Sequence, residues 1–279
     1  MSGRSQNLAW RTVAWLFLLG YLLINLIPVG WLIDTSIKTD ADAVAFPPVV
    51  FPAQMTLRAF DLALNQFQIL ANIRNSLIIT GGTTVCCALL GVVAAYGFSR
   101  FAFPGRQFLI VVVLATRMVA PIAMVIPFLV VARDLELFNS KLILVIANTA
   151  LNLPFVIWMM KGFFDSIPTE LDEAACVDGC SHLGALRRVV LPVALPGLAA
   201  TMILVFVFTW NEFLFAWALT SNLTAEPLTV ALKDFIGEQV TSWPLFSAAG
   251  VLAMIPAVVF AAIFQRYIVA GLGAGGVKG

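Results

Sequence analysis

The chain has 279 residues, of which 61% are apolar and 11% are charged, and its formal net charge is +1. Its mean hydropathy is +0.98. Because a soluble domain carries about 25% charged residues, this composition predicts an integral membrane protein. The near-neutral charge excludes a nucleic-acid-binding protein that relies on a basic surface. The cysteines are too few, and Cys86 and Cys87 too close together, for a disulfide scaffold, so we expect reduced thiols.

Six apolar stretches are long enough to cross a membrane as helices, which takes about 20 residues each. They cover residues 13–33, 77–98, 108–132, 142–160, 194–219 and 245–265. The first stretch lacks the small-residue cleavage site of a signal peptide, so we expect a retained anchor helix. The chain is therefore predicted to be an all-α membrane protein with six transmembrane helices.

Lys and Arg determine the orientation, because they concentrate in the loops that stay in the cytoplasm. The short loop 100–106 contains Arg100 and Arg106 and no acidic residue. The loop 222–243 on the other side contains more acidic than basic residues. This asymmetry predicts that both termini are cytoplasmic.

The connections between the spans differ in length. Residues 34–76, which are rich in Pro and Asp, form an outer segment that we expect to pack on the rim of the bundle. Residues 162–192 form the one long inner connection, and residues 267–279 form a cytoplasmic tail. We treat residues 1–279 as a single transmembrane domain, because no internal repeat divides them.

The long inner connection has the signals of two short helices joined by a glycine turn. Thr169 followed by Asp172 is typical of a capping box at a helix start, and Gly179 can end that helix in the left-handed conformation. Ser181 can cap a second helix, and Pro192 then begins the fifth span. Such a hairpin is either an interfacial element without a partner or a docking element for another protein.

The residues of this hairpin resemble the EAA loop of permease subunits in ABC importers. The matching positions are Glu173, Ala174, Ala175, Gly179, Val189, Leu191 and Pro192. The segments LPFVIWMMKGFFDSIPTELDEAA, WNEFLFAWALT and YIVAGLGAGGVKG resemble the maltose-type, or carbohydrate, branch of that family. The resemblance covers nearly the whole chain and implies the type I importer permease fold, with a cytoplasmic coupling helix between transmembrane helices 4 and 5.

The resemblance also implies partners. The small residues Ala174 and Ala175, which we expect to be exposed, would let an ATPase approach the backbone, with Glu173 and Asp178 beside them. A second permease subunit, two ATPase subunits and an extracytoplasmic solute-binding protein would complete the importer, which would lie in the inner membrane of a bacterium. The loop 222–243 would touch that binding protein through Gly237 and Trp243, and the tail would insert between the ATPases.

Several polar residues lie inside the predicted spans. They are Arg117, Asn148, Asn152, Trp210, Asn211 and Glu212. Arg117 is predicted to lie about 15 Å deep, where a charge needs a cavity or a partner. These residues line a pathway for a polar solute, or they join helices by hydrogen bonds, since Asn often bonds across helix interfaces. Arg117 and Glu212 could also pair with each other or with the second permease.

The chain itself contains no motif for catalysis. A P-loop is absent from the sequence, so ATP and magnesium are expected on the partner ATPase and no cofactor on this chain. The single histidine, His182, has too few ligand neighbours for a zinc site. The alternatives to an importer subunit are an ion-coupled secondary transporter, for which Glu212 would be the one deep carboxylate, and a membrane scaffold without transport.

Overall fold

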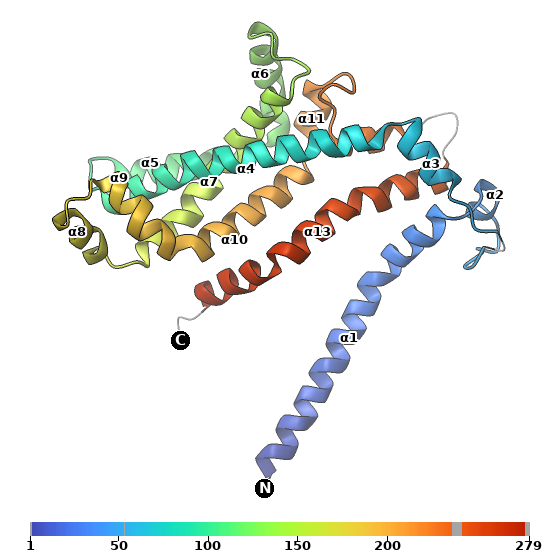
Figure 1. The fold of residues 1–279 in the computed structure, drawn as a ribbon, viewed down its shortest axis with the longest axis horizontal. Coiled ribbons are helices and arrows are strands. Elements are labelled where there is room, and N and C mark those ends of the chain that lie inside the picture. The colour runs from blue at the N-terminus through green and yellow to red at the C-terminus, as the bar shows by residue number, and fades with distance from the viewer. Residues whose placement is uncertain (1, 53, 236–241, 277–279) are drawn as a thin grey trace. The chain divides into compact units, whose positions relative to one another are not determined.

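The computed structural model describes residues 2–52, 54–235 and 242–276, and within these ranges the regular structure is helical throughout (Figure 1). The α-helices are α1 (Ser2–Ser36), α2 (Asp40–Ala43), α3 (Arg58–Asn65), α4 (Ile69–Arg100), α5 (Arg106–Ala115), α6 (Pro121–Asp134), α7 (Lys141–Asp165), α8 (Glu170–Val177), α9 (His182–Ala185), α10 (Leu191–Trp210), α11 (Leu214–Leu219), α12 (Leu228–Asp234) and α13 (Trp243–Gly276). A 3₁₀ turn, η1 (Thr116–Met118), follows α5, and a π-helical turn, η2 (Leu186–Val190), precedes α10.

Among the described residues, five helices are long and apolar enough to cross a membrane, and a bent pair of helices makes a sixth candidate. The all-α prediction is therefore confirmed. The prediction of a continuous third span over 108–132 is wrong, because the chain bends by 95° between Arg106–Met118 and Pro121–Asp134. The bend occurs because Ala120, which precedes a proline, adopts ψ 127° and so leaves the helical conformation.

The fifth span also differs from the prediction of 194–219. Its helix runs from His182 through the π-helical turn to Trp210, so Pro192 does not begin it. The π-helical turn just before Pro192 changes the hydrogen-bond pattern of the helix, so a proline, which has no N–H to donate, is tolerated there. The chain then leaves the helix at Asn211 and starts the separate short helix α11.

The chain divides into two compact units, Met1–Ile69 with Leu232–Ile255, and Leu70–Ala231 with Pro256–Gly279. In the first unit, the C-terminal end of α1 is fixed by polar contacts. Lys38 is buried, forms an ion pair with Asp34 and lies 4.5 Å from the centre of the Trp31 ring. Ser242 donates a 2.7 Å hydrogen bond to Asp40, which ties the start of α13 to α2.

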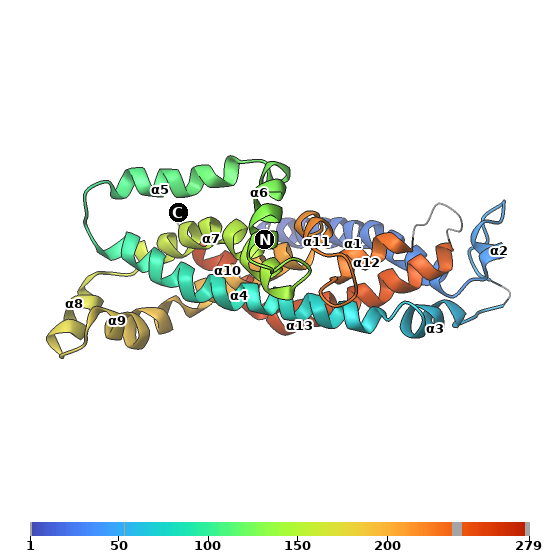
Figure 2. The same cartoon turned by 90° about the horizontal axis from the view of Figure 1, so that it is seen from above.

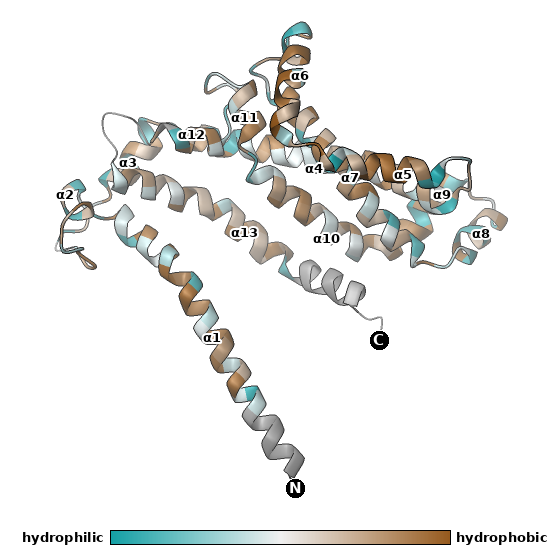
Figure 3. Ribbon diagram, turned by 180° about the vertical axis from the view of Figure 1, so that it is seen from behind, coloured by the Kyte–Doolittle hydropathy of each residue, from teal (hydrophilic) through white to brown (hydrophobic). Residues whose placement is uncertain are grey.

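The second unit contains two apolar cores that share α4 and α7; the first also includes α10, and the second includes α6, α11 and α12. One core surrounds Val156, Met160 and Phe164, and the other surrounds Leu144 and Phe215. Helix α7 contacts both α5 and α10, as Figure 2 shows from above. Figure 3 shows hydrophobic residues along α5 and α10 and hydrophilic residues at the hairpin of α8 and α9. This distribution is what a lipid-embedded bundle with a water-facing connection requires.

Candidate functional site

The bend after η1 opens a cavity of about 350 Å³ in the second unit. Its lining consists of Thr116, Arg117, Val119, Pro121, Met124, Asn148, Ala150, Leu151, Asn152, Pro154, Phe208 and Glu212. Four of the residues predicted to line a pathway, Arg117, Asn148, Asn152 and Glu212, are therefore brought together from three separate segments. The volume lies within the range of about 300–1,000 Å³ that is typical of small-molecule sites.

Arg117 lies on the 3₁₀ turn at the bend and is exposed to the cavity. Its Nη1 donates a long hydrogen bond of 3.5 Å to the Leu151 carbonyl oxygen, and its guanidinium carbon lies 5.4 Å from the centre of the Phe155 ring. Both contacts are weak for a guanidinium, which has five N–H donors. Most of the hydrogen-bonding capacity of Arg117 is therefore available to a guest in the cavity.

Asn148 and Asn152 are buried on one face of α7. The Asn152 amide donates to the Asn148 carbonyl at 2.9 Å and to the Thr209 hydroxyl of α10 at 3.4 Å. The Asn148 amide donates to the Leu144 carbonyl, but its side-chain oxygen Oδ1 is buried without a partner. Asn152 thus joins two helices, whereas Asn148 keeps one buried acceptor without a partner.

Glu212 is half-buried and stabilises the start of α11. Its two carboxylate oxygens accept hydrogen bonds from the backbone amides of Phe215 and Ala216, at 2.9 and 3.2 Å. Among the described residues Glu212 forms no ion pair with Arg117 within 4 Å. Trp210 is buried and stacks on Phe206 outside this cavity, and Asn211 is exposed with its amide on the Val207 carbonyl.

The lining combines a cation, carboxamides and a carboxylate with apolar and aromatic walls. Hydroxyl groups of a guest can accept from Arg117, while a carbon skeleton can lie against Phe208. The arrangement is suited to a hydroxyl-rich solute and has no nucleophile paired with a base.

The second part of the site is the hairpin of α8 and α9. Gly179 has φ +88°, which confirms the left-handed turn, and the Ser181 hydroxyl accepts from the Gly184 amide at 3.2 Å, which confirms the second cap. Glu173, Ala174 and Asp178 are exposed on the first arm. The prediction for Ala175 is wrong: only 6% of its surface is exposed, because the first arm packs against η2.

The predicted capping box is also wrong. Thr169 has helical angles, φ −68° and ψ −24°, and its side chain caps no amide. The carboxylate of Asp172 points away from the helix start and is buried. It accepts hydrogen bonds of 2.7 Å from the Tyr96 hydroxyl and from Nε of Arg100, both on α4.

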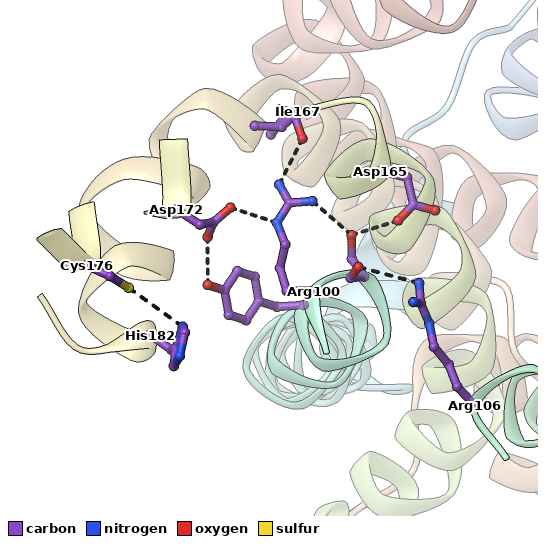
Figure 4. A network of polar contacts seen from close by, with 9 residues as sticks. Arg100, Arg106, Asp165, Ile167, Asp172, Cys176 and His182 are labelled. Carbon is purple, nitrogen blue, oxygen red and sulfur yellow. Dashed lines mark hydrogen bonds and ion pairs between the residues drawn. The ribbon is translucent and has the colours of Figure 1, made fainter. Parts of the chain in front are cut away.

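This buried contact between α4 and α8 was not expected from the sequence, where Arg100 served only to orient the chain. Arg100 also donates from Nη2 to the Ile167 carbonyl at 3.0 Å, so it lies between Asp172 and Ile167 (Figure 4). A Tyr–x₃–Arg pair at the end of one span, with an acidic residue on another connection predicted for the same side of the membrane, is the signal that could have revealed it. Leu191 and Pro192 continue the second arm into α10, and Leu191 packs on the neighbouring core.

Two further predictions concern residues outside these regions. Trp243 is described at the start of α13, with 49% of its surface exposed. Gly237 lies in the range 236–241, outside the described residues. Within the described ranges, no group of three or more His, Cys, Asp or Glu side chains could hold a metal ion. His182 instead packs edge-on against Phe101, with ring centres 5.2 Å apart.

Known proteins resemble this chain in sequence and in fold. The sulfoquinovosyl glycerol transport system permease protein SmoH of Agrobacterium fabrum is 36% identical over 92% of this chain and 91% of its own length. The trehalose transport system permease protein SugB of Mycobacterium tuberculosis is 36% identical over 93% of this chain and 94% of its own. A crystal structure of a bacterial ABC transporter involved in the import of alginate matches with a TM-score of 0.80 and 25% identity, over 96% of this chain and 99% of that one.

Residues 88–273 match the family described as the binding-protein-dependent transport system inner membrane component. Membership of this family favours ATP-driven import over ion-coupled secondary transport, and it describes a membrane component without catalysis of its own. The helical structure agrees with the fold of the matched transporter. The chain therefore belongs to the inner-membrane permease components of binding-protein-dependent ABC importers.

Proposed function

We propose that this chain forms one half of the pathway for a sugar or sugar-like solute in an ATP-driven importer. The observation that carries the proposal is the cavity of about 350 Å³, where Arg117, Asn148, Asn152 and Glu212 converge beside Phe208. Sugars present many hydroxyls and weakly apolar ring faces, and both find partners in this lining. The named solutes of the relatives, a sulfoquinovosyl glycerol and trehalose, support the same class.

The energy would come from separate ATPase subunits, which hold ATP and magnesium. The hairpin of α8 and α9 supports this role, because Glu173, Ala174 and Asp178 are exposed on its first arm and turn while Ala175 and Ala185 are buried. Glu173, Ala174, Asp178 and Gly179 are the residues that we assign to ATPase docking, with Ala175, Leu191 and Pro192 supporting their backbone. Closure of the ATPases would move this hairpin and thereby expose the cavity to alternate sides.

Two further partners, a second permease subunit and a solute-binding protein, would complete the importer. A second permease subunit would close the open side of the cavity, and a solute-binding protein would dock on the outer loop 222–243, with Trp243 and Gly237 as contacts. Support for such a partner comes from a structure with the same fold, described as an alginate ABC transporter in complex with an alginate pentasaccharide-bound periplasmic protein. Both termini would lie in the cytoplasm of a bacterial cell, with the tail 267–279 beside the ATPases.

Transport by the complete complex tests the proposal. The permease is co-expressed with its second permease and ATPase subunits, purified, and reconstituted in proteoliposomes with the cognate binding protein outside and MgATP inside. Radiolabelled trehalose, maltose and diacetylchitobiose serve as probes. We expect at least one of them to accumulate, and only when both ATP and the binding protein are present.

Two results would contradict the proposal. Uptake that survives ATP depletion but stops with an uncoupler would identify ion-coupled transport. Retention of the ATPase by both Gly179→Pro and Glu173→Lys would contradict docking at the hairpin, because the first substitution distorts the turn and the second reverses the charge at its tip. The conservative variant Leu183→Met, at an exposed apolar position of the same hairpin, serves as the matched control.

A further inference from the structure

We propose that α4 is a rigid rod that links the outer loop to the ATPase-docking hairpin across the membrane, with Asn75 and Arg100 as the positioning residues at its two ends. The inference deepens the proposed function and rests on it. It adds a route by which events at the binding-protein side and at the ATPase side influence each other. No side chain of the cavity takes part in this route.

The inner end of α4 holds the hairpin by buried polar contacts. Nε of Arg100 and the Asp172 carboxylate are 2.7 Å apart, and their side chains are only 7% and 10% exposed. The Tyr96 hydroxyl donates to the other oxygen of the same carboxylate at 2.7 Å. Removing Arg100 would leave the carboxylate buried without its countercharge, so breaking this contact costs far more than breaking a surface ion pair.

The same end of α4 also forms hydrogen bonds with the connection that leads into the hairpin. Nη2 of Arg100 donates to the Ile167 carbonyl at 3.0 Å, and the Ser99 hydroxyl donates to Asp165 at 2.7 Å (Figure 4). The last turn of α4 thus contacts the end of α7, the linker and α8. A displacement of α8 therefore moves α4, unless this joint breaks.

The outer end of α4 holds the segment 223–228 of the outer loop in a similar way. The Asn75 amide donates to the carbonyls of Leu223 and Glu226, both at 3.0 Å, and Asn75 is fully buried. The Ser76 hydroxyl accepts from the Leu228 amide at 2.8 Å. One turn of α4 therefore fixes both ends of this segment through its backbone.

Between the contacts at its outer end and those at its inner end, α4 is suited to transmit a movement along its axis. Its sequence has no proline, whereas α1, α7, α10 and α13 each have one inside the helix. Asn75 and Arg100 are 25 residues apart, which at 1.5 Å per residue is about 38 Å and exceeds the hydrocarbon layer of about 30 Å. A Cβ atom at Gly91 would lie 2.4 Å from the Val156 side chain, which shows that α4 and α7 pack closely there. This packing supports α4 against bending.

Hydrogen exchange on the complete importer tests the rod without any sugar. The permease complex in nanodiscs is compared with and without MgAMP-PNP, a nonhydrolysable nucleotide that binds the ATPases. The readout is the change in amide exchange of residues 223–228 on the outer side. We expect nucleotide to change this exchange in the wild type, and Arg100→Gln and Asn75→Ala each to reduce the response about 5- to 10-fold.

A double-variant cycle separates a rod from two independent structural contacts. Effects at sites this far apart normally add. If both residues act through one rod, Asn75→Ala with Arg100→Gln loses no more of the response than either change alone. Arg106→Gln, which removes a neighbouring arginine with a single 3.4 Å bond to the Ser99 carbonyl, is the matched control and should respond as the wild type does.

A third pair of variants interrupts the rod between its joints. Gly81 has no atom within 4 Å of a Cβ, so Gly81→Ala fits, whereas Gly81→Pro breaks the helix without touching either joint. We expect Gly81→Pro to lose the response and Gly81→Ala to keep it. A wild-type response in assembled Arg100→Gln and Asn75→Ala complexes, or additive losses in the double variant, overturns the rod. Because the readout uses no solute, a complex that responds to nucleotide but transports none of the probe sugars would contradict the solute class alone.

Discussion

Replacing Arg117 by Gln separates a solute-binding role from a structural one. The side chain makes only a 3.5 Å bond to the Leu151 carbonyl and a contact 5.4 Å from the Phe155 ring. A cation–π contact at an exposed site contributes about 0.5–1 kcal/mol. A membrane-embedded charge costs about 2.5–3.5 kcal/mol on insertion scales. Loss of the charge should therefore leave the free energy of unfolding nearly unchanged or raise it slightly.

Transport should respond differently to the same change. A hydrogen bond to a charged group contributes about 1.5–3 kcal/mol. If Arg117 donates such a bond to the solute, the loss corresponds to about a 10- to 150-fold decrease in kcat/KM for uptake. Arg117→Lys keeps the charge but loses the planar fork, so its decrease should be intermediate.

The assay compares uptake into proteoliposomes with the Tm of the purified complex for each variant. Arg133→Gln is the matched control, because Arg133 makes the same kind of contact, 5.8 Å from the Phe138 ring, but does not line the cavity. We expect Arg133→Gln to transport normally. The reasoning is refuted if Arg117→Gln transports like the wild type, or if its Tm falls by several degrees in step with its activity.

Three further predictions concern the hairpin and the helix contacts. Gly179→Val should cost about 1–2 kcal/mol, because Gly179 has φ +88°, and ATPase co-purification should weaken by about 5- to 30-fold, less for Gly179→Asn. Gly197→Ala should destabilise the complex by about 1–3 kcal/mol in thermal unfolding, because a Cβ there would lie 2.5 Å from the Phe163 ring, whereas Gly162→Ala meets no atom and should be neutral. Glu212→Ala should lower the Tm more than Glu212→Gln, since only the second keeps an acceptor for the amides that start α11.

The apolar, helical nature of the spans and their approximate places follow from the sequence, because hydropathy over about 20 residues reports on burial in lipid directly. The turn at Gly179 and the cap at Ser181 were predictable for a similar reason, since each depends on a single local conformation. That Arg117 and Glu212 line one cavity could be predicted only from the free energy of burying a charge in the membrane, because a charge deep in a span requires a cavity or a partner.

Other features depend on contacts between segments that are distant in sequence. Asp172 has the spacing of a capping residue, but a buried arginine 72 residues earlier outweighs a backbone amide as its partner. Local pattern also placed the end of the fifth span at 219, because the residues from 211 to 219 are apolar enough to continue a helix. The helix stops earlier because the Glu212 carboxylate binds the amides of Phe215 and Ala216 and so starts a new helix there.

Both interruptions in the spans lie beside the same cavity, and this position explains why the membrane tolerates them. Irregular backbone is stable at membrane depth only where protein or water satisfies its polar groups. At the first break the Thr116 hydroxyl donates to the Val113 carbonyl, and at the second the Glu212 carboxylate accepts from two amides. A continuous third span would carry Arg117 along a straight helix, whereas the bend directs the residue into the cavity with the asparagines of α7. The two breaks thus make a polar cavity possible in an otherwise apolar bundle. Helix α4 has no proline and does not line this cavity, so it can connect the outer loop with the hairpin of α8 and α9.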